Sequence, residues 1–275
     1  MNSRKNSSLI SIDGHVHFYK IFDPDLFFQK SINSFAKYFS VSDHVNEKTV
    51  NILFFSEGKE NDFFSEFKKN EIVFNDKNYK FFNTDENVSL KLMIKDKDIL
   101  YIIRGRQIVT RENIEILHIG TDITIKDGTP AKNVLEIIKK RDETAIIAWG
   151  FGKWFFGRKK VVRSLLQSDR SRFMFIGDNS ARPTIWPTPR LFLYGKKRGI
   201  KIINGSDPLP IKGEEKKPGS YFFSLTGEFN TQKPYLSIKN ILTSKDPEII
   251  FHGKRDSVFS FIKRQSAIYL KKYLH

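Results

Sequence analysis

The sequence contains no cysteine, and this absence excludes several kinds of site. Without thiols there is no disulfide framework, no thiolate zinc site and no cysteine nucleophile, so a metal site must use His, Asp and Glu. No run of about 18 apolar residues is present that could span a membrane. The opening Met1–Ser8 also lacks the apolar core of a secretory signal peptide. We therefore expect a cytoplasmic protein without a transmembrane segment.

The composition is that of a globular protein with an excess of positive charge. The 275 residues are 39% hydrophobic and 28% charged, which suits one large α/β domain or two small ones. A net charge of +16 favours anionic partners such as phosphorylated substrates, nucleic acid or an acidic membrane surface. The basic residues are spread widely, so an ordinary solvated surface explains them equally well. Among partners we favour an anionic small molecule over nucleic acid.

Apolar segments typical of strands and helices alternate along most of the chain. Strands are expected at 49–55, 99–103, 114–120, 144–149, 173–176 and 199–203, and helices at 23–39, 61–69, 130–138, 157–167 and after Pro189. This alternation indicates βα units and a mostly parallel sheet. Beyond Leu209 the pattern weakens, and 211–219 is expected to be an exposed loop. Residues 256–274 predict a basic amphipathic helix that docks on the rest of the protein, although such a helix could also lie on an acidic membrane.

The segment from Ser8 to Phe18 carries the strongest indication of a functional site. Its apolar and polar residues alternate strictly, so Asp13, His15 and His17 would project from one face of a strand. Two imidazoles and a carboxylate that converge can present lone pairs to one divalent cation. The alternative is a hairpin edge whose polar groups only form hydrogen bonds with their neighbours.

Other polar residues follow the ends of predicted strands. Glu57, His118, Asp178 and Asp207 all lie at or just after such an end. In a parallel barrel that edge carries the active site, because the βα loops converge there. We interpret His44, His252 and His275, which lack such positions, as ordinary surface or packing residues.

Together these segments resemble the PHP (polymerase and histidinol phosphatase) family, which is related in architecture to amidohydrolase barrels. The resemblance runs from about residue 8 to 210 and rests on Asp13–His17, Gly105–Ile108, Glu115–His118 and Gly199–Asp207. It implies a distorted, TIM-like (βα) barrel over 1–210 with metal ions in its mouth and hydrolysis of a phosphoester. Residues 211–275 would be a C-terminal extension packed on that barrel within a single domain overall.

The chain departs from the family pattern at several ligand positions. Ser56-Glu57 stands where the family has Asp-His, Gln107 replaces a glutamate, Trp149-Gly150 replaces His-Pro, and Pro208-Leu209 removes the final histidine. The resemblance still implies a divalent zinc, manganese or iron ion held by residues from the set Asp13, His15, His17, Glu57, His118 and Asp207. Such an ion would lower the pKa of a bound water, with Asp207 or Asp178 as the catalytic carboxylate.

A second cluster concerns the substrate. The segment from Trp149 to Lys160 combines glycines, aromatic rings and cations, and Arg182 follows the next strand. Lys153, Arg158 and Arg182 could hold a phosphate or carboxylate, although a lid with its cations in water explains the segment nearly as well.

Three functions therefore remain open. The first is a metal-dependent hydrolase of an anionic substrate, the second an amidohydrolase-like enzyme that cleaves a C–N bond, and the third a non-catalytic protein that binds polyanions. The positive charge near the expected site favours the first.

Overall fold

The computed structural model describes residues 7–39, 48–76, 79–94, 97–168 and 172–273. The strands are β1 (Ser7–Val16), β2 (Lys48–Phe55), β3 (Tyr79–Asn83), β4 (Ser89–Ile94), β5 (Lys97–Ile103), β6 (Gly105–Val109), β7 (Glu115–Ile119), β8 (Thr144–Ala148), β9 (Met174–Asn179), β10 (Ile202–Gly205), β11 (Tyr221–Glu228) and β12 (Ile250–Gly253). The helices are α1 (Pro24–Phe39), α2 (Phe63–Lys68), α3 (Ala131–Lys140), α4 (Gly157–Ser168), α5 (Arg190–Lys196), α6 (Pro234–Thr243), α7 (Val258–Tyr273) and the short 3-10 helix η2 (Glu214–Lys216).

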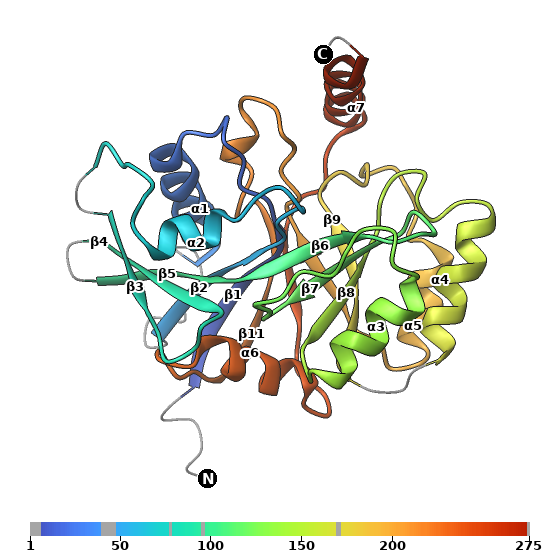
Figure 1. The fold of residues 1–275 in the computed structure, drawn as a ribbon, viewed down its shortest axis with the longest axis horizontal. Coiled ribbons are helices and arrows are strands. Elements are labelled where there is room, and N and C mark those ends of the chain that lie inside the picture. The colour runs from blue at the N-terminus through green and yellow to red at the C-terminus, as the bar shows by residue number, and fades with distance from the viewer. Residues whose placement is uncertain (1–6, 40–47, 77–78, 95–96, 169–171, 274–275) are drawn as a thin grey trace.

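The strands form two mixed sheets with an apolar core between them (Figure 1). The larger sheet has the order β12-β11-β1-β2-β5-β4-β3, and the smaller one has the order β10-β9-β8-β7-β6. Side chains of both sheets, such as Ile12 and Ile146, meet in the central core, to which α6 contributes Ile238. Helices α3, α4 and α5 cover the outer face of the smaller sheet, and α1 and α2 pack a phenylalanine-rich cluster against the larger one.

Local sequence explains where most of these elements form. In α3, Ala131, Val134, Leu135 and Ile138 are buried, at the three- and four-residue spacing of one helix face. In β8, all five residues are apolar or small and buried, as expected for a strand covered on both sides. The expected helices at 23–39 and 157–167 correspond to α1 and α4 within one or two residues.

The predicted closed (βα) barrel is wrong. In such a barrel β10 would close the ring by pairing with β1. Instead β1 pairs with β2 in parallel on one side and with β11 antiparallel on the other, so β11 occupies the edge that closure would need. The two sheets are joined locally at one end. Glu57 forms an isolated parallel bridge to Arg106, and the Asp207 N–H donates to the His15 carbonyl oxygen at 2.8 Å.

The chain beyond Leu209 is more ordered than its sequence suggests. Strand β11 lies inside the larger sheet, and its first five residues are all buried. A strand buried on both faces lacks the alternation of apolar and polar residues that marks a half-exposed strand. The prediction of an exposed loop at 211–219 is wrong at Glu214 and Glu215, which are buried in η2.

Helix α7 lies at the periphery of the protein, near the end of the chain (Figure 1). Its inward side carries Phe261, whose ring centroid is 5.1 Å from that of Phe151, and the buried Arg264. Its exposed side also carries apolar residues, namely Phe259, Ile262, Tyr269 and Leu270. The side chains of Lys271 and Lys272 and the positions of His44 and His275 lie outside the described part of the chain. No helix within the described ranges is long and apolar enough to cross a membrane.

Candidate metal centre

A β-bulge in β1 decides where the two histidines point. The pairing of β1 with β2 shifts by one residue between Asp13 and Val16. Before the shift Ile12 faces the core between the sheets, whereas after it Val16 faces the outer core against the helices. The extra residue therefore turns His15 and His17 towards the smaller sheet. The strict alternation expected from the sequence, with Asp13 on the same face as both histidines, does not hold.

His15 and His17 meet Asp207, which follows β10, where the two sheets adjoin. Their Nε2 atoms lie 2.9 Å apart. The Oδ1 atom of Asp207 is 3.5 Å from Nε2 of His15 and 3.6 Å from Nε2 of His17. Within the part of the chain that the structure describes, these are the three side chains whose ligand atoms converge closely enough to share one cation.

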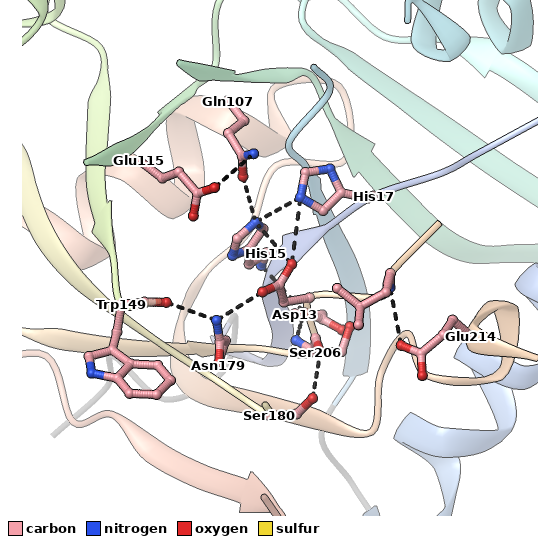
Figure 2. A network of polar contacts seen from close by, with 12 residues as sticks. Asp13, His15, His17, Gln107, Glu115, Trp149, Asn179, Ser180, Ser206 and Glu214 are labelled. Atoms are coloured by element: carbon pink, nitrogen blue, oxygen red, sulfur yellow. Dashed lines mark hydrogen bonds and ion pairs between the residues drawn. The ribbon is translucent and has the colours of Figure 1, made fainter. Parts of the chain in front are cut away.

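Asp13 anchors the segment that carries Asp207 (Figure 2). Its two carboxylate oxygens accept hydrogen bonds from the N–H groups of Ser206 and Gly219, each at 2.8 Å. Because Asp207 N–H also donates to the His15 carbonyl oxygen, three bonds tie β1 to the chain after β10. Burial raises the pKa of Asp13 to about 6. Asp13 therefore positions the backbone around the histidines and does not join their ligand atoms.

Two glycines permit the close approach of β1 and β10. A Cβ atom on Gly205 would lie 2.4 Å from both the backbone nitrogen and the Cβ of His15. A Cβ atom on Gly14 would lie 2.8 Å from the carbonyl oxygen of Asn204. Any side chain at either position would push the backbones apart and move His15 away from Asp207.

Burial keeps His17 in the neutral form that binds metals. His15 and His17 are 5% and 6% exposed. Burial lowers the pKa of His17 to about 3, and the adjacent His15 ring adds to this effect. Burial by itself would raise the pKa of Asp207, but its interactions with the neighbouring side chains, first His15 and His17 and then Arg264 and Lys153, hold it below its ordinary value. At neutral pH the group thus presents an imidazole lone pair from His17 and an ionised carboxylate, as metal ligands must.

Residues of the smaller sheet line one side of this group (Figure 2). The Oε1 atom of Gln107, on β6, is 3.2 Å from Nε2 of His15. The Nε2 atom of Gln107 is 3.5 Å from Oε1 of Glu115, which also accepts a hydrogen bond from the ammonium group of Lys153. A chain of polar contacts therefore leads from His15 to a partly exposed lysine.

Asn179, the last residue of β9, fixes the other oxygen of Asp207. Its amide donates to Oδ2 of Asp207 at 2.8 Å and to the carbonyl oxygen of Trp149 at 2.9 Å. The carboxylate of Asp207 is thereby oriented with Oδ1 towards the histidines and Oδ2 towards β9.

His118 does not join the site. Strand β7 runs antiparallel to β8, so its C-terminal end lies at the opposite end of the sheet from Trp149. There Nε2 of His118 pairs with Glu143, which also accepts a hydrogen bond from Nε of Arg141 at 2.9 Å. The first residue of β7, Glu115, is the one that reaches the site.

Glu57 also points elsewhere. Its Oε1 atom accepts the N–H of Phe64 at 3.0 Å, at the start of α2, and its Oε2 atom is 3.8 Å from Nη1 of Arg106. Arg106 and Gln107 are adjacent in β6 and project from opposite faces, so Glu57 lies on the face away from His15. Burial raises the pKa of Glu57 to about 7.

Replacing Glu57 with glutamine should change how stability depends on pH. The unfolded chain loses the Glu57 proton near its ordinary pKa of 4.5, whereas the folded protein keeps it up to about pH 7. Between these values the folded state binds more protons, so the free energy of unfolding should fall by about 3 kcal/mol as the pH rises. Urea denaturation between pH 4.5 and 8 should show this decline in the wild type and a flatter profile in Glu57→Gln. Equal slopes in both proteins would contradict the assignment.

Asp178 and Arg182 are bound to each other. Nε and Nη2 of Arg182 donate to the two oxygens of Asp178 at 2.8 and 2.6 Å, and the Tyr221 hydroxyl donates to Asp178 at 2.9 Å. Both side chains are buried, and Asp178 projects from β9 on the side opposite to Asn179. Neither reaches the histidines. Arg158 lies half-buried in the first turn of α4.

Three residues at the site have no role in the sequence-based prediction: Gln107, Glu115 and Asn179. One signal could have located Glu115. The segment between Val109 and Glu115 is too short for a parallel crossover, which needs about ten or more residues, so β6 and β7 must form an antiparallel hairpin. The N-terminal end of β7, and not its C-terminal end with His118, then lies beside the ends of the parallel strands.

Comparison with known proteins shows the fold. No protein-family model and no curated protein matches the sequence. Among solved structures, PsfC from Pseudomonas syringae PB-5123 is similar over 97% of this chain and 99% of its own, with a TM-score of 0.53 and 12% identity. The lesion-specific endonuclease PfuEndoQ from Pyrococcus furiosus matches 89% of this chain and 59% of its own, with a TM-score of 0.50 and 12% identity.

A third similar structure is an endonuclease Q complex with a 27-mer duplex substrate that has an abasic lesion at the active site. It matches 96% of this chain and 67% of its own, with a TM-score of 0.51 and 11% identity. This chain thus has the fold of PsfC and of a large part of endonuclease Q, which supports the PHP-like fold that the sequence resemblance implies.

Proposed function

We propose that the protein is a metal-dependent hydrolase in which His15, His17 and Asp207 hold a divalent cation. The observation that carries the proposal is the convergence of two imidazole nitrogens and one carboxylate oxygen, all within 4.8 Å of one another. Asp13, Glu57 and His118, which the resemblance also implies as ligands, bind other groups. The proposal therefore assigns the cation to three ligands.

The distances between the three ligand atoms are close to those around one metal ion. Ligands of a tetrahedral zinc ion, at about 2.0–2.1 Å from it, lie about 3.3 Å apart. The corresponding distances here are 2.9, 3.5 and 3.6 Å. Two histidines with one carboxylate form a donor set used by zinc and by non-haem iron. Zinc, manganese and iron all remain candidates.

Such a cation would supply the chemistry of hydrolysis, since it lowers the pKa of a bound water and polarises the scissile bond. The chain's own residues supply the geometry. Asn179 holds Oδ2 of Asp207 so that Oδ1 faces the histidines. Asp207 is the carboxylate that could orient or deprotonate the water, because Asp178 is bound to Arg182.

The substrate we favour is an anionic phosphoester. Lys153 lies at the rim of the site, where its charge helps to lower the pKa of Asp207. Lys153 pairs with Glu115 but is partly exposed. Arg158 follows in the same loop-helix segment, whereas Arg182 is buried and bound to Asp178. We therefore assign phosphate binding to Lys153 and Arg158. A nucleic-acid phosphodiester is the second candidate, supported by the net charge of +16 and by the likeness to endonuclease Q bound to a duplex.

Replacing Lys153 with alanine should lower the rate of phosphoester hydrolysis at least tenfold at 0.15 M salt. A charge-assisted hydrogen bond to a phosphate contributes about 1.5–3 kcal/mol, which corresponds to roughly ten- to hundredfold in rate. The measurement is the hydrolysis of p-nitrophenyl phosphate and bis-p-nitrophenyl phosphate with Mn²⁺ or Zn²⁺ present. Both esters are used because the first represents a small substrate and the second a nucleic-acid linkage.

The matched control is Lys263→Ala, because Lys263 is an exposed cation on α7. It should leave the rate unchanged. If both variants lose the same modest activity and high salt removes the difference, the charge acts only as a general attraction for anions. If the wild type hydrolyses neither ester with either metal, the assignment as a phosphoesterase is wrong.

A further inference from the structure

Arg264 of α7 is buried against the segment that carries Asp207. It is 3% exposed, and its Nη2 atom donates to the carbonyl oxygen of Asp207 and to the carboxylate of Glu214, each at 2.7 Å. Its Nη1 atom donates to Asp256 at 2.6 Å and lies 3.4 Å from the hydroxyl of Ser180. One guanidinium group thus joins the chain after β10, η2, the segment before α7 and the end of β9.

The backbone of Asp207 needs such support. Its φ angle is +48°, in the left-handed region that is uncommon for a residue with a side chain. Such a conformation persists only where surrounding contacts hold it. The Asp207 N–H is bound by the His15 carbonyl oxygen, and its own carbonyl oxygen is bound by Arg264. These two bonds fix the peptide groups on both sides of the residue and thereby the direction of its side chain.

We infer that Arg264 is a positioning residue that holds the Asp207 carboxylate towards His15 and His17. The inference rests on the proposed function, because it gives Asp207 the role of a metal ligand. A fork-shaped guanidinium suits this task, since Nη2 bonds the backbone oxygen of Asp207 and the carboxylate of Glu214 while Nη1 stays paired with Asp256. A lysine has a single nitrogen and cannot reproduce that geometry.

Lys217 provides a matched control. Its ammonium group is 2.5 Å from Oδ1 of Asp256, so it neutralises one of the carboxylates that Arg264 also binds. Removal of Lys217 disturbs the same cluster of charges around Asp256. A loss specific to Arg264 therefore reports the bond to Asp207 and not the general stability of the cluster.

The test compares Arg264→Lys with Lys217→Met by two measurements. Amide hydrogen exchange of the metal-free protein, followed by NMR, reports the Asp207 N–H directly. Titration calorimetry with Mn²⁺ and with Zn²⁺ reports the affinity of the site. In Arg264→Lys we expect exchange at Asp207 and the dissociation constant each to rise at least tenfold, while exchange in β8 stays unchanged. In Lys217→Met we expect both quantities to match the wild type.

The inference is overturned if Arg264→Lys leaves exchange at Asp207 or metal affinity unchanged, or if Lys217→Met has the same effects. If the wild type binds neither metal, the proposed metal centre fails, and exchange at Asp207 still decides whether Arg264 holds this residue. Should Arg264→Lys not fold, Arg264→Gln combined with Glu214→Gln removes one charge of each sign and takes its place.

Discussion

Replacing both His15 and His17 with alanine should reduce the bound divalent cation from one per chain to none. The two imidazoles supply two of the three converging ligand atoms, and a lone carboxylate from Asp207 cannot retain the ion. The fold should persist, because the histidines lie at the end of β1 and their side chains bond one another, Gln107 and Asp207. Metal analysis of tag-free protein, saturated with Mn²⁺ or Zn²⁺ and then dialysed, measures the loss, and circular dichroism checks the fold.

His252→Ala is the matched control for this double substitution. His252 is partly buried on β12, two strands across the larger sheet from β1, and bonds the hydroxyl of Ser224 at 2.7 Å. Its removal should leave one ion bound. An unchanged metal content in the double variant would refute the site, and so would a wild-type protein that retains neither metal.

Replacing Arg182 with alanine should lower the free energy of unfolding by about 3–5 kcal/mol, because it leaves the buried Asp178 carboxylate without its partner. The sequence pattern indicates that Arg182 contacts the substrate, and this role predicts lost activity in a stable protein. The structure predicts lost stability in its place. Urea denaturation measures the difference.

Two further variants sharpen this prediction. Arg182→Ala combined with Asp178→Asn should lower the free energy of unfolding by less than the sum of the two single substitutions, because no unpaired charge remains. Arg190→Ala, which removes an exposed arginine at the start of α5, should change stability by no more than about 0.5 kcal/mol. A stable Arg182→Ala protein that has lost only hydrolysis would show that Arg182 serves the substrate.

Most helices and strands can be predicted from the sequence because their causes are local. The apolar spacing of α3 and the continuous apolar run of β8 depend on residues within one element. The His-x-His segment is visible for the same reason, and Gly205-Ser206-Asp207 can be recognised as the end of a strand. These motifs were enough to place His15, His17 and Asp207 among the six candidate metal ligands, together with Asp13, Glu57 and His118.

The tertiary structure alone decided which polar residues share that site. The bulge between Asp13 and Val16 turned the histidines away from Asp13, and it depends on the pairing of β1 with β2. Because β7 runs antiparallel to β8, Glu115 at its N-terminal end lies at the site, and His118 near its C-terminal end does not. The insertion of β11 beside β1 prevented a closed barrel, and the burial of Arg264 brought α7 to Asp207. Each of these outcomes depends on hydrogen bonds between segments far apart in the chain. The residue pattern of one segment does not specify which other segment it will pair with.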